Sequence, residues 1–207
     1  MDIFNWIAAS LVIASMLYLT FALTLPQWMD SYRKGEAVSL VPARAGQARP
    51  MWMQYVLLVV GIALAILLFY YLWTPFVELP EATARILQII GLLLYIAGFG
   101  FLMWARRTLG RHWGVSTSLQ AKLHPDHELI MSGPYARVRH PMYFGGWVLM
   151  FGLVLLYPTW VMLILFISML ASLLMRARRE EAALEERFGE KWEEYKKRTR
   201  FMIPFLY

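Results

Sequence analysis

Two groups of polar residues border one apolar stretch in the C-terminal half of the chain. Residues 133–143 read GPYARVRHPMY and place arginines, a histidine and tyrosines where the apolar stretch begins. Residues 176–181 read RARREE and follow its end. Polar side chains at a hydrocarbon border are costly unless they bind one another or a ligand. We therefore predict that the two groups lie on opposite sides of one binding site.

The residue types in these groups indicate the class of ligand. Glu180 and Glu181 are carboxylates, which can bind ribose hydroxyls, and arginine binds a carboxylate through two parallel hydrogen bonds. Consecutive helical residues point about 100° apart, so the two glutamates face different partners. Arg176 lies four residues before Glu180, a spacing suited to an ion pair. These residues predict a polar cofactor meeting an apolar acceptor; the alternative is a solvated run of charge at a membrane exit.

Other kinds of site have weaker support. Cysteine is absent, which excludes thiolate metal sites and a cysteine nucleophile. The serines lack a Gly-x-Ser-x-Gly context. His124 and His127, with Asp126 or Glu128, offer metal ligands, but their spacing fits no standard zinc pattern. We therefore predict no metal, and the alternative to a cofactor site is a set of interfacial histidines bound to backbone or lipid headgroups.

The composition is that of an integral membrane protein. Of the 207 residues, 59% are hydrophobic and only 16% are charged, against about 25% charged in soluble domains. The mean hydropathy is +0.49 and the pI is about 9.6. Basic residues lie beside apolar runs, as in loops that face anionic lipid, and no nucleic-acid reading motif is recognisable. Nucleic-acid binding is therefore disfavoured.

The apolar runs predict about five transmembrane helices in an all-α fold. The runs are residues 3–25, 51–73, 86–105, 142–157 and 159–175. The first three have about the 20 residues that a spanning helix needs. Pro158 separates the last two, which favours a short helical hairpin over one kinked helix. Because Asp2 replaces the basic start of a signal peptide, we expect the first run to be a retained anchor.

The basic residues predict the orientation of these spans. All of the 20 lysines and arginines except Arg85 fall in segments that five spans place on one side. The positive-inside rule then puts the N-terminus outside and the C-terminus in the cytoplasm. Residues 106–141 hold all four histidines, including His112, and several prolines, so we expect an irregular, partly re-entrant cytoplasmic loop region.

The C-terminal tail predicts an amphipathic helix that leaves the membrane. From residue 176 to about 198 an apolar stripe recurs at helical spacing, and Gly189 interrupts it. The stripe consists of Leu184, Phe188, Trp192 and Tyr195. We expect this helix to lie on the bilayer or to cap the bundle. The whole chain, residues 1–207, is predicted to be one integral-membrane domain, with a three-span part at 1–105 and a cofactor-binding catalytic part at 106–207.

The C-terminal half resembles the isoprenylcysteine carboxyl methyltransferases and their phospholipid N-methyltransferase relatives. The resemblance rests on ordered motifs over about residues 106–205: HELI at 127–130, GPY at 133–135, RHPMY at 139–143, a hairpin, Glu180-Glu181, Phe188-Gly189, Trp192, YKKR at 195–198 and Pro204. It implies S-adenosylmethionine as a cytoplasmic methyl donor and a lipophilic acceptor that enters from the bilayer. The N-terminal half matches only as generic spans.

The resemblance also implies roles for single residues. Arg176 and Glu181 match acceptor-facing, catalytic positions. The residues implied to bind the cofactor are His127, Leu129, Tyr135, Arg139, His140, Tyr143 and Glu180, with Gly98 and Gly100 from the phospholipid branch. Gly98-Phe99-Gly100 also begins like a dinucleotide fingerprint, but small residues inside an apolar helix more often allow close helix packing.

The reaction that follows is an in-line methyl transfer, for which a site supplies alignment and excludes water. A carboxylate acceptor needs a cation such as Arg176 to hold it, whereas an amine acceptor has to lose a proton, in which Glu181 would assist. The sequence leaves the acceptor and the oligomeric state open. Two other functions are weighed: a membrane reductase that uses NADPH, like the sterol reductases, and a non-catalytic lipid-binding protein.

Overall fold

The computed structural model describes residues 2–26, 51–110 and 128–203, and this part of the chain is helical apart from its connections and two isolated β-bridges. The helices are α1 (Ile3–Leu17), the π-helical η1 (Tyr18–Thr24), α3 (Met51–Leu72), α4 (Glu81–Leu109), the 3₁₀ helix η3 (Gly133–Ala136), α5 (Pro141–Leu156), α6 (Trp160–Phe188) and α7 (Glu190–Arg198). The all-α prediction is confirmed for these residues.

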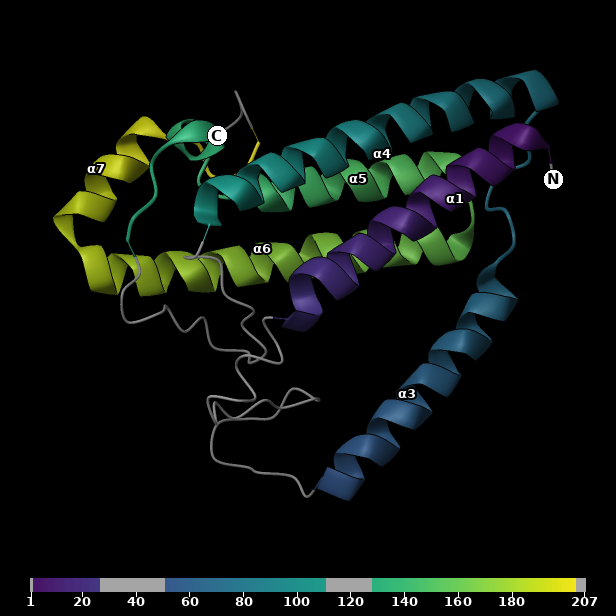
Figure 1. Cartoon of the computed structure of the whole chain (residues 1–207), viewed down its shortest axis with the longest axis horizontal. Helices are drawn as coiled ribbons and strands as arrows, with labels where there is room; N and C mark the ends of the chain where they lie inside the picture. The colour runs from purple at the N-terminus through teal and green to yellow at the C-terminus, as the bar shows by residue number, and fades with distance from the viewer. Residues whose placement is uncertain (1, 27–50, 111–127, 204–207) are drawn as a thin grey trace. The chain divides into compact units, whose positions relative to one another are not determined.

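The described residues fall into two compact units, and the boundary crosses α3 at residues 58 and 59. In the first unit, α1 begins after Asp2, whose side chain accepts a hydrogen bond of 2.9 Å from the Asn5 amide. This bond caps one of the free N–H groups of the first turn. In the second unit, α5 packs along α4 and also contacts α6 (Figure 1). The predicted single domain stays a prediction. Helix α4, which the sequence assigned mostly to the N-terminal part, packs on α5 in the part predicted to bind the cofactor.

Glycines allow α4 and α5 to approach each other closely. A Cβ atom on Gly98 would clash with the backbone of Leu149 and lie 2.8 Å from the Gly145 carbonyl oxygen. One heptad earlier, a Cβ atom on Gly91 would lie 2.7 Å from the Gly152 carbonyl oxygen. The obstacles are backbone atoms, which cannot swing aside. In the fold, Gly98 therefore allows two helices to pack closely, which is one of the two roles that the sequence suggested.

The predicted hairpin is present as two separate helices, α5 and α6, joined at Pro158. Its turn pairs with the segment that follows α3, since the Phe76 amide donates to the Pro158 carbonyl over 3.1 Å and the Trp160 amide to the Thr74 carbonyl over 3.1 Å. The Phe76 and Trp160 rings meet edge to face, with centroids 5.9 Å apart. The end of the hairpin opposite α7 is thus an aromatic cluster, as is typical of a membrane interface.

Three of the described helices are long and apolar enough to cross a membrane: Ile3–Leu23, α4 and α6, while α5 is apolar but has only 16 residues. The predicted count of five spans and their orientation remain predictions. Helix α6 continues without a break from its apolar part into the charged residues after Met175, as predicted. It ends at Gly189, whose φ of +48° is one that favours glycine, and α7 starts anew. The predicted apolar stripe is therefore divided between two helices.

Candidate functional site

The candidate site lies where the segment before α5 meets the charged part of α6 and the tail after α7. The Arg139 amide donates to the Arg200 carbonyl over 2.9 Å, and the Arg200 amide donates to the Arg137 carbonyl over 2.9 Å. The His140 amide donates to the Phe201 carbonyl over 3.1 Å. The first two bonds form a parallel bridge centred on Val138 and Arg200, and the third extends the pairing by one residue. The tail thus fixes the backbone that carries Arg139 and His140.

Glu181 is bound by the first of these two side chains and contacted by the second. Arg139 Nε donates to Glu181 Oε1 over 2.6 Å, and His140 Nε2 lies 3.3 Å from the same oxygen. The side chains of Arg139 and Glu181 are only 12% and 19% exposed. Glu181 Oε2 accepts no hydrogen bond from the residues that the structure describes. The ion pair is well shielded from solvent, and one carboxylate oxygen stays available to a ligand.

Glu180 faces a second set of partners. Tyr143 donates its hydroxyl to Glu180 Oε1 over 2.6 Å, and Arg176 Nε donates to the same oxygen over 2.9 Å. Glu180 Oε2 lies 3.8 Å from His140 Nδ1. The two consecutive glutamates therefore diverge toward different partners, as helix geometry predicts.

The His140 ring lies between the two carboxylates and packs against two other aromatic rings. It stacks on Tyr143, with centroids 5.4 Å apart and an angle of 3° between the planes. Phe201 meets it edge to face at 5.2 Å. Only 6% of His140 is exposed. The ring therefore has a fixed orientation between two glutamates, each of which is paired with an arginine.

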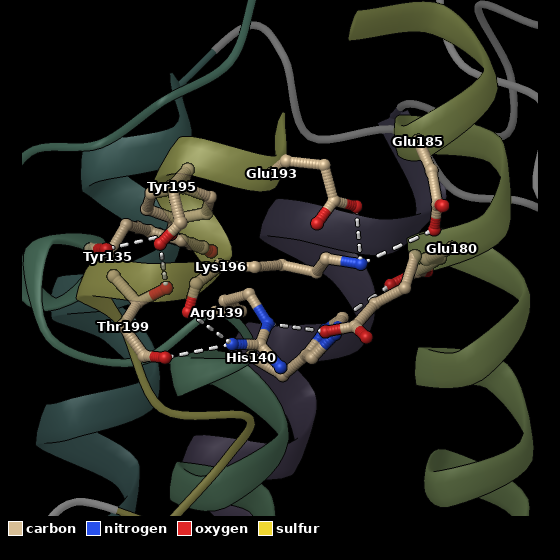
Figure 2. Close-up of polar contacts among 10 residues, drawn as sticks. Tyr135, Arg139, His140, Glu180, Glu185, Glu193, Tyr195, Lys196 and Thr199 are labelled. Carbon is tan, nitrogen blue, oxygen red and sulfur yellow. Dashed lines mark hydrogen bonds and ion pairs between the residues drawn. The ribbon is translucent and has the colours of Figure 1, made fainter. Parts of the chain in front are cut away.

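Helix α7 closes one side of this site. Tyr195 donates its hydroxyl to the Tyr135 carbonyl over 2.7 Å, and both tyrosines are buried (Figure 2). Burial raises the pKa of Tyr195 and of Tyr135 above the ordinary value, so both hydroxyls stay neutral donors. Trp192 is buried beside Tyr195, with ring centroids 5.5 Å apart. Helix α7 therefore contacts the segment before α5, and its expected place on the bilayer or as a cap of the bundle stays a prediction.

Replacing Tyr195 with phenylalanine is expected to destabilise the protein by about 1–2 kcal/mol, because the buried Tyr135 carbonyl loses its donor. Thermal unfolding in detergent measures the effect as a lower Tm. Tyr70→Phe is the matched control, because Tyr70 is 77% exposed on α3. Equal Tm values for both variants would show that the Tyr195 contact adds nothing to stability.

The structure gathers six of the predicted site residues into one cluster: Arg139, His140, Tyr143, Arg176, Glu180 and Glu181. Tyr135 joins it through Tyr195, and Leu129 lies half-buried just before η3. Gly98 packs against α5, and Gly100 has open space where a side chain would be. His127, His112 and His124 lie outside the described residues.

Sequence reasoning missed the contribution of the tail. Arg139 Nη1 donates to the backbone carbonyls of Thr199, over 2.8 Å, and Lys196, over 3.4 Å. Every residue has a backbone carbonyl, so residue types and motifs cannot identify which carbonyls accept these hydrogen bonds. The sequence predicted residues 195–198 only as part of an amphipathic helix and of the resemblance, with no contact to Arg139.

Similarity to known families agrees with this geometry. The family model for phospholipid methyltransferase matches residues 86–191. The chain is 36% identical to protein-S-isoprenylcysteine O-methyltransferase of Schizosaccharomyces pombe over 87 residues, which are 42% of this chain and 37% of that protein. It is 34% identical to the Saccharomyces cerevisiae protein of the same name over 125 residues, 59% of this chain and 51% of that one. The chain thus spans roughly a third to a half of the length of these curated relatives.

The fold is also similar to a solved structure. The eukaryotic intramembrane Ras methyltransferase, an isoprenylcysteine carboxyl methyltransferase, superposes with a TM-score of 0.50 at 22% identity. The match covers 76% of this chain and 54% of that one. The described helices therefore form a fold similar to that of this membrane enzyme. With the family model covering half of its residues, the chain belongs to the isoprenylcysteine carboxyl methyltransferase and phospholipid methyltransferase family of integral membrane proteins.

Proposed function

We propose that the protein is an S-adenosylmethionine-dependent methyltransferase that methylates a lipophilic acceptor at the cytoplasmic face of a membrane. The observation that carries the proposal is His140, held between Glu180 and Glu181 at the end of an apolar helical hairpin in a chain of this family. Hydrogen-bonding groups that converge at the end of a hydrocarbon-length bundle suit a polar methyl donor that meets an apolar substrate.

The donor set fits such a cofactor. S-adenosylmethionine supplies a methyl group activated on a sulfonium, together with ribose hydroxyls, an ammonium and a carboxylate. Glu181 Oε2 is an available acceptor for hydroxyl or ammonium donors, and the stacked His140 and Tyr143 rings form a rigid wall beside it. Leu129 and Tyr135, before and within η3, would complete the pocket.

The role of this chain in the reaction is to align and to shield. The buried His140, the ion pair of Arg139 with Glu181 and the cap by α7 keep bulk water from one side of the site. Alignment of the reacting atoms and exclusion of water are what an in-line methyl transfer asks of a protein. Arg176 is held by Glu180 while its side chain stays 42% exposed, so it is placed to bind an acceptor carboxylate.

The geometry supports a carboxylate acceptor over an amine. An amine has to lose a proton before attack, and Glu181 is the residue we considered for that task. Glu181 accepts from the Arg139 guanidinium, and such pairing favours the charged carboxylate and makes it a poor base. A carboxylate acceptor arrives already deprotonated. The two curated relatives are named as isoprenylcysteine O-methyltransferases, which supports a prenylcysteine-type carboxyl as the acceptor.

The membrane side is proposed from charge alone. Five spans with 19 of the 20 basic residues on one side favour a cytoplasmic site and C-terminus and an external N-terminus. Cysteine labelling of single-cysteine variants in intact cells tests this directly, because the natural chain contains no cysteine.

We expect purified protein to bind S-adenosylhomocysteine and to transfer a methyl group to N-acetyl-S-farnesylcysteine. His140→Ala is expected to weaken this binding about tenfold, since a ring contact and its hydrogen-bonding capacity are worth roughly 1–1.5 kcal/mol. Calorimetry and a radiolabel assay measure the two quantities. Absence of binding, or stabilisation by NADPH in place of S-adenosylhomocysteine, would reject the proposal. Transfer to phosphatidylethanolamine but not to the farnesylcysteine would overturn the carboxylate assignment.

A further inference from the structure

The guanidinium of Arg139 binds the protein itself through two of its three nitrogens, Nε and Nη1. It donates through Nε to Glu181 on α6 and through Nη1 to the carbonyls of Thr199 and Lys196 (Figure 2). Its carbon atom Cζ also lies 5.7 Å from the centre of the Phe201 ring. One side chain therefore joins the charged end of α6 to the tail. The resemblance implied direct contact with the cofactor for Arg139, whereas these contacts with α6 and the tail favour a role in holding the protein together.

The tail joined in this way also holds His140. The Phe201 carbonyl accepts from the His140 amide, and the Phe201 ring packs against the imidazole edge. The family model ends its match at residue 191, so these tail contacts lie beyond the matched region. Arg139, Glu181, His140 and Phe201 consequently form one connected unit that includes residues from three segments.

From this connection we infer that Arg139 is a positioning residue, which aligns Glu181 and the tail residues 199–201 around His140 without touching the methyl donor or the acceptor. The inference rests on the proposed function for its kinetic consequences. Its structural part, the attachment of the tail by Arg139, stands independently of any reaction.

The chemistry of arginine explains why this position needs it. A guanidinium is a planar fork that donates in several fixed directions at once, whereas lysine offers a compact point charge on a flexible stem. Arg139→Lys keeps the charge next to Glu181 but cannot reach the Thr199 carbonyl with the same geometry. The substitution therefore distinguishes the effect of the positive charge from the effect of the hydrogen bonds to the tail.

The kinetic test uses Arg139→Lys, with Arg137→Lys as the matched control because Arg137 is exposed and lies two residues away. Arg139→Lys is expected to lower kcat about tenfold while the Kd for S-adenosylhomocysteine changes less than threefold. Arg137→Lys changes neither. A Kd that rises as much as kcat falls would show that Arg139 contacts the cofactor, and it would overturn the inference.

A double-mutant cycle tests whether Arg139 acts through Glu181. If it does, Arg139→Lys combined with Glu181→Gln lowers kcat/KM no more than about threefold beyond the larger single effect. Multiplicative losses would mean that the two residues act independently, and the inference would fall. Phe201→Leu provides a second route, since it disturbs the same unit from the tail and is expected to give the same pattern of kcat and Kd.

Hydrogen exchange tests the structural part in protein without any ligand. The amides of Arg139, His140 and Arg200 are donors in the bridge, so Arg139→Lys is expected to speed exchange in peptides that contain them at least fivefold. Arg137→Lys leaves the same peptides unchanged. Unchanged exchange in Arg139→Lys would overturn the attachment of the tail. If the natural protein neither binds S-adenosylhomocysteine nor transfers methyl groups, the proposed function fails while this result still decides the role of Arg139.

Discussion

Glu180→Gln is expected to lower kcat/KM about 100-fold or more. Glu180 Oε1 accepts from both Tyr143 and Arg176, and Oε2 lies near His140. Hydrogen bonds to a charged group are worth about 1.5–3 kcal/mol each. A 100-fold loss of kcat/KM corresponds to roughly 2.7 kcal/mol, and the loss of both bonds costs more than that. The amide also places an N–H group against donors. Steady-state transfer to N-acetyl-S-farnesylcysteine measures the effect.

Glu186→Gln is the matched control for this result, because Glu186 is exposed on the same helix, α6. We expect its kcat/KM to equal that of the natural protein. If Glu180→Gln retained a third or more of the natural kcat/KM, Glu180 would be one member of a solvated run of charge and no part of a site.

Gly98→Ala is expected to lower the stability of the second unit by about 2–3 kcal/mol, since overpacking against fixed atoms costs 1–3 kcal/mol and the added methyl group meets backbone. For a chain of this length the loss corresponds to a Tm lower by roughly 4–12 °C. Thermal unfolding in detergent or nanodiscs measures it. The same variant distinguishes the two interpretations of Gly98: a packing role lowers Tm, whereas a cofactor role lowers affinity for S-adenosylhomocysteine at unchanged Tm.

Gly100→Ala is the control, because no atom of another described element lies within 4 Å of the Cβ position at Gly100. Alanine replaces glycine in a helix interior there, so an unchanged or slightly raised Tm is expected. A Tm for Gly98→Ala equal to that for Gly100→Ala would contradict close packing of α4 on α5 at this residue.

The long apolar helices were predictable because each has a strong local signal. Pro158 between two apolar runs identified the α5–α6 hairpin, and the glycine at 189 marked the end of α6. The bridge between Val138 and Arg200 was not predictable, because it pairs two short segments with no period and depends on tertiary contacts. The division into two units at residues 58 and 59 has no counterpart in composition either.

The members of the site were predictable, but their pairing was not. Residue type and helical spacing identified the pair Arg176 and Glu180 correctly. The same reasoning could not show that Arg139 binds Glu181, because 42 residues separate them. Nor could it show that backbone carbonyls of the tail accept from Arg139 Nη1, since every residue type carries the same carbonyl.

The shortness of α5 has a consequence for where the chemistry takes place. Its 16 residues rise about 24 Å, some 6 Å less than the hydrocarbon thickness of an ordinary bilayer. One end carries the aromatic cluster around Trp160 and the other carries His140. With the aromatic end at one interface, the bilayer either thins locally or submerges the charged cluster beneath the opposite headgroups. In both cases the charges would meet the upper carbons of acyl chains, so the lipophilic acceptor proposed above would reach them without leaving the lipid.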